Sequence, residues 1–160
     1  MMRNHYRLVF LLLCIVQLLI NNYFNLSQYL LLSLLPLCIM ILPLKKNSGI
    51  VDLFVAFALG LLVDFASSSV IGISSCSLLL LAFLKKTLIS MICGEEIFFQ
   101  SFRELILLFI LSCAIYFLPY VLIDCAGTRP FLFVLAKWLC STAASAFVCC
   151  ICSLILFREK

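Results

Sequence analysis

Long apolar runs, separated by short polar or charged stretches, follow one another along the whole chain. They do not alternate apolar and polar positions as the strands of a membrane barrel do; residues 30–35, for example, read Leu-Leu-Leu-Ser-Leu-Leu. A helix needs about 20 apolar residues to cross the hydrocarbon core of a bilayer. The pattern therefore predicts membrane helices, with spans at about 6–24, 29–44, 50–66, 71–91, 104–123 and 131–156.

The composition narrows the class of protein further. Of the 160 residues, 66% are apolar and 11% are charged, whereas soluble domains are roughly 45–50% apolar and about 25% charged. Six spans would take roughly 120 residues, which leaves no room for a separate soluble domain. Residues 1–160 are therefore expected to form one all-α integral membrane domain, and enzymes that work wholly in water, nucleic-acid binders and secreted disulfide scaffolds are disfavoured.

The basic residues are distributed unequally between the two faces that this segmentation defines. Lys and Arg accumulate in short loops on the cytoplasmic side of membrane proteins. The loops on the opposite face carry only Arg129, and Lys137 falls within the sixth span. The distribution predicts that both termini lie in the cytoplasm, and the residues that determine this topology are Arg3, Arg7, Lys45, Lys46, Lys85, Lys86, Arg103, Arg158 and Lys160.

The third span carries a row of small and acidic side chains. Asp52, Ala56, Gly60 and Asp64 recur at four-residue intervals and so share one face of a helix. Small residues allow a neighbouring membrane helix to approach closely. An aspartate inside a span costs roughly 2.5–3.5 kcal/mol on insertion scales, so Asp64 requires a polar partner.

The sequence offers two partners for Asp64. Lys137 is expected at a similar depth on the sixth span, so the two could form a buried polar pair or share a pocket with Ser141. Alternatively, Asp64 caps the turn at residues 67–69 through backbone hydrogen bonds, while Lys137 extends outward beside Trp138. Both alternatives remain open at this stage.

The sequence contains no recognised catalytic or metal-binding motif. There is no Gly-rich phosphate loop, no H-E-x-x-H and no G-x-S-x-G. The ten cysteines lack a metal-site spacing: the C-x-x-C within residues 149–152 lies in an apolar helix without a second pair or a histidine. We expect no enzymatic activity, no metal and no cofactor, and we interpret the cysteines as small apolar side chains.

The turn after the third span resembles the signature of a known family. Residues 60–64 read Gly-Leu-Leu-Val-Asp, and Ser67, Ile71 and Gly72 follow. This run is similar to the G-L-L-x-D-x-x-S-x-x-x-L-G motif of the rod shape-determining membrane protein MreD family. The similarity extends over roughly residues 10–90.

Other features of that region agree with the family, and some depart from it. Gln17 in the first span, Pro36 in the second and the basic loop at residues 45–46 are similar to the family pattern. The family often has Gly or Pro in the turn where this chain has Ser68 and Val70.

The resemblance implies a non-enzymatic, multi-pass component of the bacterial inner (cytoplasmic) membrane. It would act as a scaffold of the cell-elongation complex, binding a bitopic MreC-like protein and, indirectly, an MreB-type filament and peptidoglycan synthases, without nucleic acid. Gly60, Asp64, Ser67 and Gly72 would then serve helix packing. The family also resembles the substrate-binding subunits of energy-coupling-factor vitamin transporters in fold, so a membrane subunit that binds a small molecule is the alternative.

Overall fold

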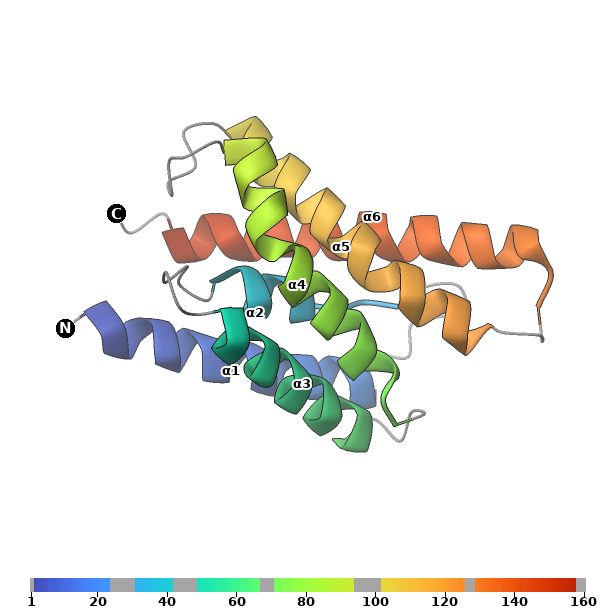
Figure 1. Ribbon diagram of the computed structural model, residues 1–160, viewed down its shortest axis with the longest axis horizontal. Helices are drawn as coiled ribbons and strands as arrows, with labels where there is room; N and C mark the ends of the chain where they lie inside the picture. Colours follow the sequence, from blue (N-terminus) through green and yellow to red (C-terminus); the bar gives the residue numbers. More distant parts are fainter. Residues whose placement is uncertain are drawn as a thin grey trace.

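The computed structural model describes residues 2–23, 31–41, 49–66, 71–93, 102–125 and 129–157, and these are all-helical, without a strand. The helices are α1 (Met2–Tyr23), α2 (Leu35–Ile41), α3 (Gly49–Ala66), α4 (Ile73–Cys93), α5 (Phe102–Asp124) and α6 (Phe131–Phe157) (Figure 1). The prediction of an all-helical protein is confirmed, and α3 to α6 match the predicted spans to within two residues at each end.

The second predicted span is wrong as a continuous helix. Residues 31–34 are not helical, and α2 has only seven residues. The reason is Pro36, which occupies the first turn of α2. Its ring would clash with the carbonyl group of Leu32 if the helix continued upstream, and it has no N–H to donate. The chain therefore crosses the interior of the protein as an extended segment followed by a short helix.

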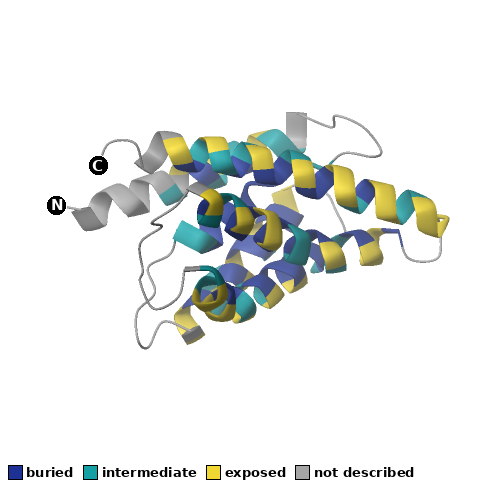
Figure 2. Cartoon of the chain, turned by 90° about the horizontal axis from the view of Figure 1, so that it is seen from above, coloured by how far each residue is buried: buried dark blue, intermediate teal, exposed yellow. Residues whose placement is uncertain are grey.

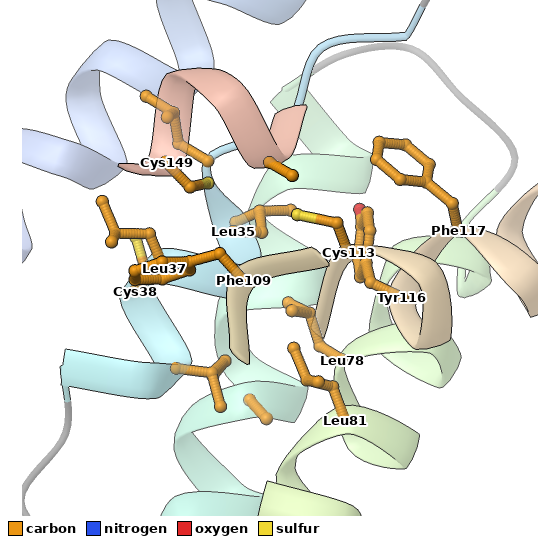
Figure 3. Close-up of a cluster of buried hydrophobic side chains, with 14 of the residues drawn as sticks. Leu35, Leu37, Cys38, Leu78, Leu81, Phe109, Cys113, Tyr116, Phe117 and Cys149 are labelled. Atoms are coloured by element: carbon orange, nitrogen blue, oxygen red, sulfur yellow. The ribbon is translucent and has the colours of Figure 1, made fainter. Parts of the chain in front are cut away.

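The short helix α2 lies at the centre of the protein, in contact with α1, α4, α5 and α6 (Figure 1). The longer helices pack in sequence order around it, α3 against α4, α4 against α5, and α5 against α6. Figure 3 shows side chains from four helices meeting there: Leu35, Leu37 and Cys38 from α2, Leu78 and Leu81 from α4, Phe109, Cys113, Tyr116 and Phe117 from α5, and Cys149 from α6. Burial on every side explains why α2 shows no polar face.

The outer surface of the bundle is apolar. Exposed residues lie on the outward sides of the helices (Figure 2), and many are large hydrophobic side chains such as Phe54, Phe83 and Leu132. Within the described residues, three segments are long and apolar enough to cross a membrane: Ile73–Ile92, Arg103–Asp124 and Phe131–Leu154. An apolar exterior of this extent is typical of a protein surrounded by lipid. The arrangement of six spans and the orientation of the termini stay predictions.

Candidate functional site

The turn between α3 and α4 is organised by Asp64. Its carboxylate accepts hydrogen bonds from the backbone N–H of Gly72 (2.8 Å) and of Ser74 (3.3 Å). Gly72 is the residue before α4, because its carbonyl oxygen accepts the first helical bond, from the N–H of Cys76 at 2.9 Å. The first N–H groups of a helix have no partner within it. Asp64, although it belongs to α3, therefore caps the N-terminus of α4.

Gly72 is suited to this position by its backbone conformation. Its φ of 104° lies in the region that side chains with a Cβ rarely adopt. Space is not the constraint, because a Cβ at this position would meet no atom within 4 Å. The family-like Asp64 and Gly72 are thus two halves of one capped turn, while Ser67 lies outside the described residues.

Gly60 brings α3 and α4 into close contact. A Cβ added to Gly60 would overlap the backbone of Ser75. Ala56, one turn earlier on the same face, is also fully buried. The neighbouring helix that the small residues of α3 allow to approach closely is α4.

The N–H groups of the extended segment before α2 donate hydrogen bonds to side chains on α1 and α6. The N–H of Leu31 donates to Ser141 Oγ (3.0 Å), and that of Ser33 donates to Ser145 Oγ (3.0 Å). The N–H of Leu34 donates to Gln17 Oε1 at 2.6 Å. Backbone that is not helical is tolerated at membrane depth only where protein or a watery cavity satisfies its polar groups. The small polar residues of the sixth span supply those groups here.

A small cavity of about 30 Å³ lies beside this segment. A cavity needs about 10–15 Å³ to hold one water molecule, so this one has the size for one or two. The hydrogen bond from Gln17 Nε2 to Asn21 Oδ1 (2.8 Å) orients both amides. The polar lining residues are Gln17, Asn21, Ser33, Ser74, Tyr116 and Tyr120. Sequence reasoning did not find this cluster, whose members come from α1, α4, α5 and the extended segment.

The predicted pairing of Asp64 with Lys137 is wrong. Lys137 Nζ lies 2.7 Å from Asp124 Oδ2, so the lysine joins the two ends of α5 and α6. The outward extension of Lys137 is also wrong, since the residue is only 8% exposed. Asp64 does cap backbone N–H groups, those of Gly72 and Ser74, whereas the turn at residues 67–69 that it was predicted to cap lies outside the described residues. Ser141 bonds the extended segment instead of joining a pocket with these charges.

The position of Lys85 differs from the one that the predicted topology required. We expected this lysine at the cytoplasmic surface, but it lies within α4, is 1% exposed, and pairs with Asp52 of α3 (Nζ to Oδ2, 3.5 Å). A buried lysine held by a carboxylate carries no information about which side of a membrane a loop faces. Its neighbour Lys86 and Arg103, in the first turn of α5, are exposed as expected.

The structure does not test the other basic residues from which the cytoplasmic position of the termini was predicted. Lys45, Lys46, Arg158 and Lys160 lie outside the described residues, and so do the side chains of Arg3 and Arg7 on α1. The cysteines of the described residues are free thiols, and no group of three or more potential metal ligands occurs within that part of the chain.

Comparisons with known proteins give no relative: no protein-family model, curated protein or solved structure matches this chain. Buried polar side chains hold the non-helical backbone of residues 31–34 in place through hydrogen bonds. Asp64, Ser141 and Ser145 bond to backbone groups, and Asp52 and Asp124 pair with lysines, whereas the buried hydroxyls of Ser75 and Ser153 have no hydrogen-bond partner within the described residues. Such an arrangement fixes how the helices meet.

Proposed function

We propose that this protein is a non-enzymatic membrane scaffold that binds a bitopic, MreC-like partner in the bacterial cell-elongation complex. The observation that carries the proposal is the agreement between the family-like motif and the turn between α3 and α4. Three motif residues, Gly60, Asp64 and Gly72, each have a distinct role there: close packing, capping and a left-handed backbone. Motif residues with such joint roles are expected of a shared structural signature.

The interior of the protein also favours a scaffold over the alternative, a subunit that binds a vitamin. Pockets for small organic molecules have volumes of about 300–1,000 Å³. The polar cavity beside residues 31–34 has about 30 Å³, which is too little for a molecule of that kind. The side chains of Tyr116 and Phe117, both almost fully buried, line this cavity.

Depletion of the protein in the cell that produces it tests the proposal. Rod-shaped cells are expected to become round, and the tagged protein is expected to co-purify with a membrane protein that has one span and a large periplasmic part. Cells that keep their width after depletion would contradict the proposal. Purification together with ATPase subunits, or with a retained vitamin, would favour the transporter alternative.

A matched pair of variants separates a specific effect from general damage. Gly60→Leu disrupts the contact with Ser75, whereas Ala58→Leu adds the same side chain at an exposed position on the same helix. The first variant is expected to lose both cell shape and the partner, and the second to retain both. Equal behaviour of the two variants would show that the contact between α3 and α4 has no part in the function.

A further inference from the structure

Residues 31–34 bring non-helical backbone into the interior of the protein, so each N–H and carbonyl group there needs a partner. The N–H groups of Leu31, Ser33 and Leu34 donate to the side chains described above. The carbonyl oxygens of the same three residues accept hydrogen bonds, respectively, from Ser145 Oγ (3.4 Å), Cys149 Sγ (3.8 Å) and the N–H of Cys38 (3.2 Å). Leu32 is the exception: within the described residues, neither its N–H nor its carbonyl oxygen has a hydrogen-bond partner.

The position of Pro36 explains why the carbonyl group of Leu32 is left over. In a helix this carbonyl would accept a hydrogen bond from the N–H of the residue four positions later. That residue is Pro36, which has no N–H. A peptide group without a partner is costly at membrane depth, where only protein or a watery cavity can satisfy it.

The polar cavity described above lies beside this peptide group, because Leu32 is one of its lining residues. Four polar side chains of the lining, those of Gln17, Ser33, Ser74 and Tyr116, are deeply buried, and none of these residues is more than 5% exposed. The cavity is large enough for at least one water molecule. A buried water typically makes about three hydrogen bonds to polar groups that otherwise lack partners, and the lining offers that many.

The orientation of two amide side chains also favours water as the occupant. The N–H of Leu34 can only donate, so the atom of Gln17 at 2.6 Å from it is the oxygen. The amide nitrogen of Gln17 then donates to Asn21 Oδ1 (2.8 Å). Both amide oxygens thus already accept a hydrogen bond, and the amide N–H groups that remain can only donate. Such donors favour an occupant that accepts hydrogen bonds, as water does, over a metal cation.

We propose that the cavity binds an ordered water molecule, which hydrogen-bonds to the backbone of Leu32 and to the buried hydroxyl groups of Ser33, Ser74 and Tyr116. This water completes the hydrogen bonding of the break in the second span. Because the N–H of Ser74 donates to Asp64 (3.3 Å), the water also links the break to the capped turn between α3 and α4. The site is independent of the scaffold function, since it rests only on the cavity and on the backbone of residues 31–34.

Labelling of the full-length protein in mild detergent by hydroxyl radicals from brief X-ray irradiation tests the proposal. Bound water yields radicals as bulk water does, so a buried side chain beside a bound water is oxidised while other buried side chains are protected. Phe117 lines the cavity and is 1% exposed, whereas Phe109, on the same helix, is 3% exposed and does not line it (Figure 3). We expect oxidation of Phe117 to be several times faster than that of Phe109. Equal rates for the two rings would overturn the proposal.

A matched pair of variants tests whether the water occupies this cavity. Ser74→Val replaces a hydroxyl group of the lining with methyl groups and is expected to lower the oxidation of Phe117 to the rate of Phe109. Ser77→Val, at a fully buried position on the same helix outside the lining, should leave the fast oxidation unchanged. Fast oxidation of Phe117 in a folded Ser74→Val variant would overturn the assignment. Thermal unfolding shows whether each variant is folded, and the comparison of the two rings in the unaltered protein requires no variant.

A crystal structure of the full-length protein that resolves bound water tests the role of Leu32. A water oxygen is expected at about 2.7–3.2 Å from the backbone nitrogen or the carbonyl oxygen of Leu32. Water that contacts only side chains of the lining, or a hydrogen bond from another part of the chain to this peptide group, would overturn that role.

Discussion

Two pairs of consecutive helices, α3 with α4 and α5 with α6, differ in how the aspartate near the turn is bound and in how closely the helices pack. Each pair turns within a few residues, and each has an aspartate near the end of its first helix. In the first pair Asp64 binds the backbone at the start of the next helix. In the second pair Asp124 binds the side chain of Lys137 instead. The first pair packs closely through Gly60, whereas the second leaves an apolar groove.

The residue that precedes the second helix explains the difference. Gly72, before α4, has an N–H group and no side chain, so its N–H is available to Asp64. Pro130 precedes α6, and its carbonyl oxygen accepts the bonds from the N–H groups of Phe133 and Val134, but it has no N–H to offer. Asp124 therefore lacks that backbone donor and takes the lysine. A carboxylate near the end of a helix can thus serve as a cap or as an ion partner, and the residue before the next helix differs between the two cases.

The largest expected effect is that of Lys85→Met, which removes one half of a buried ion pair in the tightly packed helix pair. Asp52 would remain buried without its lysine, and such a loss costs about 3–5 kcal/mol. The free energy of unfolding is measured in mild detergent by the labelling of buried thiols such as Cys38. The exposed Lys86→Met is the control, and the double variant with Asp52→Asn should recover part of the loss. Equal stability of the two lysine variants would contradict the buried position of Lys85.

Asp64→Ala should produce the next largest effect. The variant leaves the N–H groups of Gly72 and Ser74 without their acceptor, at about 1–3 kcal/mol for each unsatisfied buried group. Asp64→Asn retains one acceptor oxygen and should recover part of the stability. The same unfolding measurement compares the two. If alanine and asparagine behaved alike, hydrogen bonding to this turn would not be the role of Asp64.

Gly60→Ala should destabilise the protein by roughly 1–2 kcal/mol. Overpacking typically costs about 1–3 kcal/mol, and the better helix propensity of alanine returns up to about 1 kcal/mol. The added methyl group meets the backbone of Ser75, which cannot rotate away. The comparison is with Ala143→Gly at an exposed position on α6, where the difference in helix propensity alone should change the stability. A gain in stability for Gly60→Ala would contradict the close approach of α3 and α4.

The smallest effect is expected for Lys137→Met in the second helix pair. The side chain of Asp124 is 41% exposed, so the carboxylate stays solvated after the lysine is removed. Pairs of this kind contribute at most about 1 kcal/mol. The ratio between the losses of unfolding free energy for Lys85→Met and Lys137→Met therefore compares the stability that each ion pair contributes to its pair of helices. A loss for Lys137→Met as large as that for Lys85→Met would remove the distinction.

Periodicity and composition predicted the long helices well, because continuous apolar runs leave few other structures for a membrane chain. The break in the second span could have been found from Pro36, since a proline in the first turn marks where a helix begins. The partners of Lys85 and Lys137 could not be predicted in this way. Which charged side chains meet depends on the rotation of each helix about its axis, and the hydropathy of a span does not fix that rotation.

The extended segment before α2 has a consequence for the order in which the chain can be inserted into a membrane. Its N–H groups bond to Ser141 and Ser145, which follow 110 and 112 residues later in the sequence. Each unsatisfied peptide group in hydrocarbon costs several kcal/mol. The hydrogen bonds of this segment are therefore completed only once α6 has been synthesised, although the segment itself is made much earlier.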